Sequence, residues 1–268
     1  MSTLEALVLG AVQGLTEFIP ISSSGHLVLV PEALGWDEPG LAFDVLLHAA
    51  SLIALLIYFS GDLLDLARGF LSRDEASRRM VYLLAVGTIP SAIAGIVLAD
   101  FFEQQFADAD AAAVQLILTA VILVGAEQAV RYHEKRTAQT GASLRTMEDL
   151  RTPDALIVGV AQAVSILPGI SRSGSTIGAG LALGVERDDS ARFAFLLAIP
   201  ALFGAMLVKL PELADSSLGF GAGFAGFVAS LLTSYGAIWG LIRYLKTNTL
   251  YPFAVYCVIA GIAFLIAV

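Results

Sequence analysis

Two short stretches of this sequence gather hydroxyl, imidazole and guanidinium groups. Residues 20–26 read PISSSGH, and residues 168–174 read PGISRSG. A helix that begins at either stretch would direct its free N–H groups, and the positive end of its dipole, at a ligand in front of it. Two such helix starts facing each other would bind an anion such as phosphate.

The small residues of both stretches suit that task. Their hydroxyls stand at positions that cap helix N-termini, and a glycine directly after each serine cluster lets the backbone approach a ligand closely. These candidate ligand-binding residues are Ser22, Ser24, Gly25, Ser171, Ser173 and Gly174. The other interpretation, that small residues only cap and pack helices, stays open.

Arg172 and Glu17 are the charged residues at these stretches. The planar fork of Arg172 suits two phosphate oxygens at once. Glu17 precedes the first stretch and shares a helical face with Gln13, four residues earlier, which is a further candidate substrate-binding residue. If the two stretches meet, Glu17 and Arg172 either serve a bound phosphate or form an ion pair that only joins the stretches. The hydrophobic composition of the chain indicates a membrane protein, and an arginine at membrane depth is costly unless it faces a partner or an anion. We therefore favour the functional interpretation.

His26 follows Ser23 by three residues, so the imidazole and the hydroxyl can lie close together on one helix. A histidine beside a serine can activate the hydroxyl as a nucleophile, with Glu17 orienting or assisting the base. A histidine that is only packed is the alternative. Asp44 and His48 form a further i, i+4 pair, which either supports the site or is only a local polar pair.

The composition indicates that these residues lie in a membrane protein. The chain has 268 residues, of which 57% are hydrophobic and 15% charged, and its mean hydropathy is +0.80. Soluble domains carry about 25% charged residues. Low charge and a single cysteine, Cys257, exclude a disordered chain and a disulfide scaffold. A net charge of -9 argues against nucleic acid as a partner.

Six segments are apolar enough to cross about 30 Å of hydrocarbon, which takes roughly 20 helical residues each. They lie near residues 42–59, 79–99, 112–130, 192–210, 222–242 and 250–267. Two more apolar stretches, near 4–34 and 154–185, are broken at the serine clusters. Non-helical backbone at membrane depth is tolerated only inside protein or a water-filled cavity, so we predict re-entrant hairpins whose tips meet. Glu127 and Asp100 lie near predicted helix ends, where we expect solvation.

The two broken stretches also match each other at a constant offset of 149 residues. The matching pairs are Gly10 with Gly159, Gln13 with Gln162, Thr16 with Ser165, Ile21 with Ile170, Ser22 with Ser171, Ser24 with Ser173 and Gly25 with Gly174. Each repeat would hold one re-entrant hairpin and three transmembrane helices, and three crossings invert the second copy. We therefore predict an all-α polytopic membrane protein with an inverted repeat. It forms a single domain over 1–268, with repeat 1 at about 1–132, a loop at about 133–152 and repeat 2 at about 153–268.

The charges of the predicted loops test this transmembrane topology independently of the repeat. Loops near 60–78, 131–152, 185–192 and 243–249 fall on one face of the predicted path, and they hold or border 13 of the 15 basic residues. The positive-inside rule makes that face cytoplasmic. Both termini, the loop 31–41 and the site entrance would then lie outside, in a cell membrane. Met1 to Leu7 include Glu5 and no basic residue, so we expect no cleavable signal peptide.

At the two tips the sequence resembles the undecaprenyl-diphosphate phosphatase family of the bacitracin-resistance type. Residues 13–26 read QGLTEFIPISSSGH, similar to the family's E/Q-x-x-x-E motif followed by a serine-rich tip and a histidine. Residues 168–176 read PGISRSGST, similar to its P-G-x-S-R-S-x-x-T motif. The resemblance covers the whole length, spans and hairpins included.

The resemblance implies hydrolysis of a polyprenyl diphosphate to the monophosphate and inorganic phosphate, which recycles a lipid carrier for cell-envelope glycans. It implies essential roles for Glu17, His26 and Arg172 and makes Ser23 the nucleophile or its close assistant. Phosphate binding would fall to three hydroxyl residues of the second motif, Ser171, Ser173 and Thr176.

The resemblance also implies a divalent cation, usually Mg²⁺. Glu17 is a candidate ligand, but Gln13 stands where a second carboxylate would otherwise be. A homodimer stays open. Inverted repeats with broken helices are also a transporter plan, so a secondary transporter or lipid-phosphate flippase is the alternative function. Ser23, His26 and Arg172 favour the enzyme, because a transporter needs two access states rather than a nucleophile.

Overall fold

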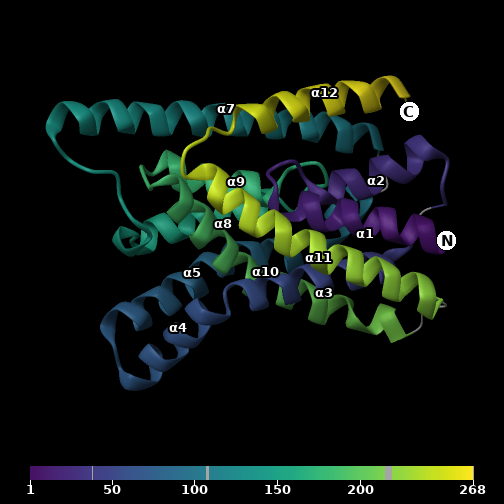
Figure 1. The fold of residues 1–268 in the computed structure, drawn as a ribbon, viewed down its shortest axis with the longest axis horizontal. Coiled ribbons are helices and arrows are strands. Elements are labelled where there is room, and N and C mark those ends of the chain that lie inside the picture. Colours follow the sequence, from purple (N-terminus) through teal and green to yellow (C-terminus); the bar gives the residue numbers. More distant parts are fainter. Residues whose placement is uncertain (38, 107–108, 215–218, 268) are drawn as a thin grey trace.

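The computed structural model describes residues 1–37, 39–106, 109–214 and 219–267, and these residues are almost entirely helical (Figure 1). The helices are α1 (Thr3–Phe18), α2 (Ser23–Leu34), α3 (Leu41–Tyr58), α4 (Ser60–Ser72), α5 (Glu75–Val97), α6 (Ala99–Phe106), α7 (Ala109–Thr140), α8 (Thr152–Val164), α9 (Arg172–Ala182), α10 (Arg187–Ala214), α11 (Phe220–Leu245) and α12 (Tyr251–Ala267), with a short 3-10 helix at Met147–Asp149. Within those ranges, a single bridge between Arg145 and Val185 is the only extended pairing. The predicted all-α class is confirmed.

Within the described part of the chain, five helices are long and apolar enough to cross a membrane, namely α3, α5, α7, α10 and α11. Each overlaps one of the predicted spans over most of its length. The sixth predicted span is α12, which is apolar but has only 17 residues. The chain is therefore a multi-pass membrane protein, as predicted, with five spans of full length and a shorter sixth helix.

The segment 60–78, which was expected to be a loop, contains the helix α4. None of its residues is buried. The helix ends at Arg73, whose φ is +67°, and Asp74 then caps α5 by accepting the Ser77 N–H at 2.8 Å. An amphipathic helix can lie along a membrane surface without crossing it, which explains how a polar connection can be helical.

Both stretches predicted to be interrupted are interrupted. Helix α1 stops ahead of Pro20 and α2 starts after Ser22, while α8 and α9 flank residues 165–171. The four helices have 16, 12, 13 and 11 residues. Each is shorter than the roughly 20 residues that a span requires.

Each broken stretch begins with a helix that packs closely on a long helix from the other half of the chain. Helix α1 lies along α11, and α8 lies along α5 (Figure 1). A Cβ atom at Gly10 would lie 2.3 Å from the Gly226 carbonyl oxygen, and one at Gly159 would lie 2.2 Å from that of Gly87. Small residues at these crossings let the helix backbones touch.

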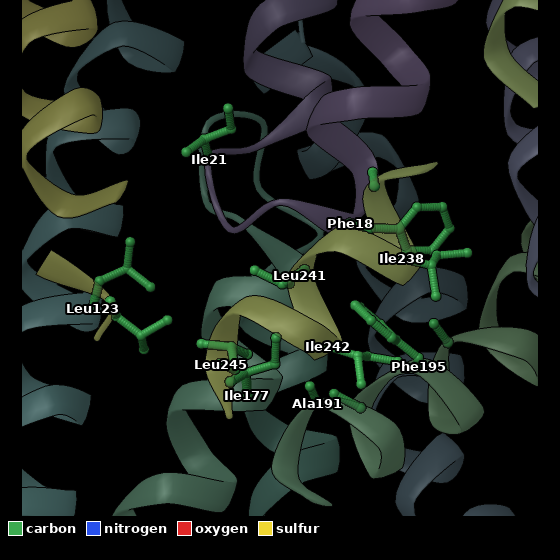
Figure 2. Close-up of a cluster of buried hydrophobic side chains, with 14 of the residues drawn as sticks. Phe18, Ile21, Leu123, Ile177, Ala191, Phe195, Ile238, Leu241, Ile242 and Leu245 are labelled. Carbon is green, nitrogen blue, oxygen red and sulfur yellow. The ribbon is translucent and has the colours of Figure 1, made fainter. Parts of the chain in front are cut away.

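The apolar core surrounds the breaks. Figure 2 shows Phe18, at the end of α1, and Ile21, within the first break, in the same cluster as Ile177 of α9. Phe18 packs edge-on against Phe195 of α10, with ring centroids 5.4 Å apart. Both termini lie at one end of the molecule, and α4 lies at the other end (Figure 1).

Glu127 is not solvated, contrary to expectation. Its side chain is 0% exposed, and it accepts hydrogen bonds from Arg187 at 2.7 and 3.0 Å, from Arg131 at 3.0 Å and from the Leu250 N–H at 3.1 Å. The prediction failed because α7 continues to Thr140, well past the predicted end of its span. The carboxylate therefore joins α7, α10 and the start of α12 instead of facing water.

Candidate active site between two broken helices

Glu17, on the last turn of α1, is the centre of the site. Its side chain is 2% exposed. Arg172 Nη2 lies 2.5 Å from Glu17 Oε1, and Gln13 Nε2 donates to Oε2 at 3.0 Å. The Ser23 hydroxyl also donates to Oε2. A buried carboxylate requires such partners, because burial of a lone charge is strongly unfavourable. The structure thus joins Gln13, Glu17, Ser23 and Arg172, all four predicted from the sequence.

Arg172 is the first residue of α9 and comes from the opposite broken stretch. Its side chain is 24% exposed. Within the described residues it donates only through Nη2, to Glu17. A guanidinium carries five N–H donors, so most of them remain for a ligand. The ion pair that the sequence left open therefore exists, and it does not use up the capacity of Arg172 to bind phosphate.

The first tip has the predicted capping geometry. The Ser22 hydroxyl accepts the Gly25 N–H at 3.4 Å and lies 3.3 Å from the Ser24 hydroxyl. The two tips also touch, because a Cβ atom at Gly25 would lie 3.0 Å from the Gly169 Cα. A side chain at position 25 would therefore press on the second tip.

The second tip repeats this pattern. The Ser171 hydroxyl accepts the Gly174 N–H at 3.0 Å and lies 3.1 Å from the Ser173 hydroxyl. Ser173 also donates to the Ile19 carbonyl at 3.3 Å, which is a direct bond between the two tips. Thr176 donates to the Arg172 carbonyl at 2.8 Å, so in this structure its hydroxyl serves the helix backbone.

Thr119 of α7 supports the second tip, and sequence reasoning missed it. Its hydroxyl donates to the Gly169 carbonyl at 2.8 Å and accepts the Ser171 N–H at 3.0 Å. Thr119 is 1% exposed. No local signal could have identified it, since its partners lie about 50 residues away along the chain.

His26 has partners other than the expected one. Its Nδ1 lies 2.7 Å from the Ser22 carbonyl oxygen, and its Nε2 lies 2.7 Å from the Tyr256 hydroxyl on α12. The Ser23 hydroxyl, which we expected beside the imidazole, donates to Glu17 instead. In the structure, Glu17 and not His26 therefore accepts the hydrogen bond of the Ser23 hydroxyl. Tyr256 was also missed, because it is 230 residues from His26.

His48 belongs to the site as well. Its Nε2 lies 3.7 Å from Glu17 Oε2, and its Nδ1 lies 2.8 Å from the Asp44 carbonyl oxygen. Between the two interpretations left open for this pair, the structure favours the supporting one, since His48 faces the central carboxylate. The contact with Asp44 runs through the backbone of α3 rather than through its carboxylate.

The oxygen donors at Glu17 suit Mg²⁺ only in part. No group of three or more His, Cys, Asp or Glu side chains among the described residues could hold a metal ion. The Oε1 atom of Gln13 is buried and has no hydrogen-bond partner in the structure, and the amide nitrogen of the same side chain donates to the Glu17 carboxylate. Mg²⁺ is commonly held by one or two carboxylates together with substrate phosphates. Gln13 and Glu17 therefore fit a magnesium ion whose other ligands come from a phosphate substrate.

Comparison with known proteins gives a consistent picture. The sequence profile of the family described as "Bacitracin resistance protein BacA" matches residues 6–263. An undecaprenyl-diphosphatase of Methanosphaera stadtmanae is 40% identical over 278 residues, covering 98% of this chain and 96% of the relative. One of Syntrophotalea carbinolica is 42% identical and covers 97% of each chain. One of Myxococcus xanthus is 38% identical and covers 99% of this chain and 89% of the relative.

Proposed function

Since this chain belongs to the BacA family, we infer that it is an undecaprenyl-diphosphatase, which hydrolyses undecaprenyl diphosphate to the monophosphate and inorganic phosphate and so recycles the lipid carrier. One observation supports this function above all others. The buried Glu17 carboxylate contacts both a serine hydroxyl and an arginine, and these two groups start opposite half-helices. That arrangement offers a nucleophile, a proton acceptor and an anion clamp around one point.

We propose that the terminal phosphate of the substrate lies between the two tips. The Nη1 and Nε groups of Arg172, with the N–H groups of the first turns of α2 and α9, would bind its oxygens. The hydroxyls of Ser24 and Ser173 adjoin these turns and would add further contacts. The polyprenyl tail would remain among the apolar helices. Stabilisation of charge on the transferred phosphoryl group is the main source of rate in such reactions.

In the chemical step, the Ser23 oxygen attacks the terminal phosphorus while its proton moves to Glu17 Oε2. The bridging P–O bond breaks, and the polyprenyl monophosphate leaves with the bridging oxygen. A water molecule then hydrolyses the phosphoserine, which releases inorganic phosphate and restores the Ser23 hydroxyl. Direct attack by a water molecule that Glu17 deprotonates is the second version of this step.

Gln13 Oε1 and Glu17 are the residues that would hold a magnesium ion in this proposal. A bound Mg²⁺ supplies positive charge that offsets the charge of the phosphate oxygens. The clamp function of Arg172 is derived from its position alone and does not require the ion.

We also propose the inverted repeat and its orientation in the membrane. The match at an offset of 149 residues supports the repeat. The reciprocal packing of α1 on α11 and of α8 on α5 supports it as well, because Gly10 and Gly159, which match at that offset, each contact a glycine of a long helix in the other half. In a two-fold arrangement, a helix of each half makes the same contact with a helix of the other half.

The basic loops lie at the end opposite the termini, so the positive-inside rule supports a cell membrane in which both termini and the site entrance face outside. Single cysteines in place of Asp37 and Gly141, in a Cys257→Ser background, test this orientation in intact cells. A membrane-impermeant maleimide should label only the cysteine at position 37. Labelling of position 141 alone would reverse the orientation.

The enzymatic function is tested by phosphate release from undecaprenyl diphosphate in detergent, with and without Mg²⁺. Wild type should release phosphate, and Arg172→Ala should lose about 100-fold or more in kcat/KM, as expected for loss of a charge-stabilising group. Arg172→Lys is the matched control, since it keeps the charge without the planar fork, and it should retain an intermediate rate. Ser23→Ala distinguishes the two chemical versions, because near-normal turnover would exclude the phosphoserine. A folded wild type that releases no phosphate under any metal condition would favour the transporter instead.

A further inference from the structure

The two tips match in sequence but differ in backbone strain. Ser22, which caps α2, has φ +67° and ψ 101°, whereas its counterpart Ser171, which caps α9, has φ -67° and ψ 121°. A positive φ is uncommon for a residue other than glycine, and it persists only where surrounding contacts hold it. Ser22 directly precedes Ser23, the proposed nucleophile, so the contacts that hold Ser22 also orient Ser23.

His26 is the contact that holds Ser22. The Ser22 carbonyl oxygen accepts the His26 backbone N–H at 3.3 Å and lies 2.7 Å from His26 Nδ1. A carbonyl oxygen only accepts, so Nδ1 carries the hydrogen. The second tip repeats only the backbone bond, from the Ser175 N–H to the Ser171 carbonyl at 2.8 Å. Ser175 is the counterpart of His26 at the offset of 149 residues and has no ring nitrogen to add the second contact. The strained tip has the histidine, and the unstrained tip does not.

Tyr256 binds the other ring nitrogen of His26 and so extends the row of hydrogen bonds that ends at the Ser22 carbonyl. With a hydrogen on Nδ1, the neutral imidazole has its lone pair at Nε2, and the Tyr256 hydroxyl donates to it over 2.7 Å. The two rings stack with an interplanar angle of 12°, and Phe264 meets the imidazole edge-on. His26 is 3% exposed. Both ring nitrogens are thus occupied by partners other than Ser23 and Glu17.

We propose that Tyr256 is a positioning residue that acts through His26 on the Ser22 carbonyl, and that His26 orients the first tip rather than accepting the proton of Ser23. This inference rests on the proposed phosphatase function. Thr119 provides the parallel at the other tip, where a hydroxyl from α7 binds the backbone on both sides of Ile170. Helix α12 packs along part of the longer helix α7, so one pair of helices supports both tips (Figure 1).

Kinetics of conservative variants distinguish orientation from proton transfer. Tyr256→Phe keeps the stacked ring and removes the hydroxyl, and it should lower kcat about five- to tenfold without changing the shape of the pH profile. His26→Asn can still donate to the Ser22 carbonyl, because its amide nitrogen replaces Nδ1, and it should stay within about tenfold of wild type. His26→Gln places its amide near Nε2, so it should lose more activity than His26→Asn.

Tyr251→Phe is the matched control on the same helix, since the ring of Tyr251 contacts Arg131 far from the tips. It should retain wild-type kinetics. The proposal is overturned if His26→Asn and His26→Gln both lose about 100-fold or more, as removal of a general base would require. It is also overturned if Tyr256→Phe shifts the pH profile or has no effect on kcat.

Nitrogen-15 NMR of histidine-labelled protein provides a readout that does not depend on activity. The chain has three histidines, so His26→Asn identifies the His26 resonances by their loss. We expect the Nδ1-protonated tautomer in wild type and a shift of the Nε2 resonance in Tyr256→Phe. An Nε2-protonated His26 ring would refute the proposed hydrogen bonds from Tyr256 to His26 and from His26 to Ser22, even if the enzyme is active. Conversely, the expected tautomer in a protein that releases no phosphate would refute the phosphatase assignment and leave the geometry intact.

Discussion

Thr119→Val is a direct test of the second tip. The substitution exchanges a hydroxyl for a methyl group of nearly the same size, so packing changes little while two hydrogen bonds disappear. The Gly169 carbonyl loses its donor and the Ser171 N–H loses its acceptor. Both groups lie at a buried position, because Thr119 is 1% exposed.

The magnitude follows from the two groups left without partners. An unsatisfied buried polar group costs about 1–3 kcal/mol. Interhelical hydrogen bonds in membrane proteins average only about 0.6 kcal/mol, because freed groups find other partners. Gly169, with φ +95°, is confined by contact with the Ala112 backbone, so its carbonyl has little freedom to turn to another donor. We therefore expect a loss of about 2–4 kcal/mol of stability for the two groups together.

Part of the lost stabilisation should also lower the rate of catalysis, because Ser171 caps the helix that begins with Arg172. If half of it reaches the transition state, kcat/KM falls about 5- to 30-fold, at 1.4 kcal/mol for each factor of ten. The assay is phosphate release from undecaprenyl diphosphate, run alongside thermal unfolding in detergent. Thr119→Ser keeps the hydroxyl and is the matched control, which should remain near wild type. A Thr119→Val enzyme within about twofold of wild type in kcat/KM would refute the argument that this hydroxyl positions the tip.

Two further substitutions test the packing around the site. Gly159→Ala would place a Cβ atom 2.2 Å from the Gly87 carbonyl oxygen, so α8 must move from α5, and we expect a loss of about 1–3 kcal/mol in unfolding. Gly125→Ala is its control, with no described atom within 4 Å of the new Cβ, and an equal loss there would contradict the close-contact argument. Glu127→Gln removes the buried counter-charge of Arg187 and should destabilise the protein by about 3–5 kcal/mol in denaturant titrations, with unchanged turnover per folded molecule. Unchanged stability would indicate that Glu134, which already accepts a hydrogen bond from Arg187 at 3.2 Å, suffices as its partner.

The sequence predicted the elements that local chemistry determines. Pro20 and the serines after it marked the first break. The cost of an arginine at membrane depth indicated that Arg172 has an anion or a carboxylate as its partner. The match at an offset of 149 residues further predicted that the two tips meet. These inferences succeeded because breaks, caps and buried charges leave a signal within a few residues.

The residues that support the tips could not be predicted in this way. Thr119 and Tyr256 lie within apolar helices, where a lone hydroxyl has no periodic signal. Their partners are brought to them only by the packing of α7 and α12. The same limit explains the error about Ser23 and His26, because a spacing of three residues brings them to one helical face but does not determine where each side chain bonds. The positive φ of Ser22 and the carboxylate of Glu17 decide that instead.

The chemistry depends on where the two similar tips differ. Ser23 is the first residue of α2 and Arg172 is the first residue of α9, and they match at the offset of 149 residues. The same helix position thus holds the proposed nucleophile in one half and the anion clamp in the other, and both contact Glu17. Glu17 itself is matched by Ile166, so only one half supplies a carboxylate. An exact two-fold arrangement would bring two serines or two arginines together, and neither pair could both attack and stabilise one phosphate. Two similar tips bring two helix starts to one point, and in the proposed mechanism the differences between the tips at these positions make that point reactive.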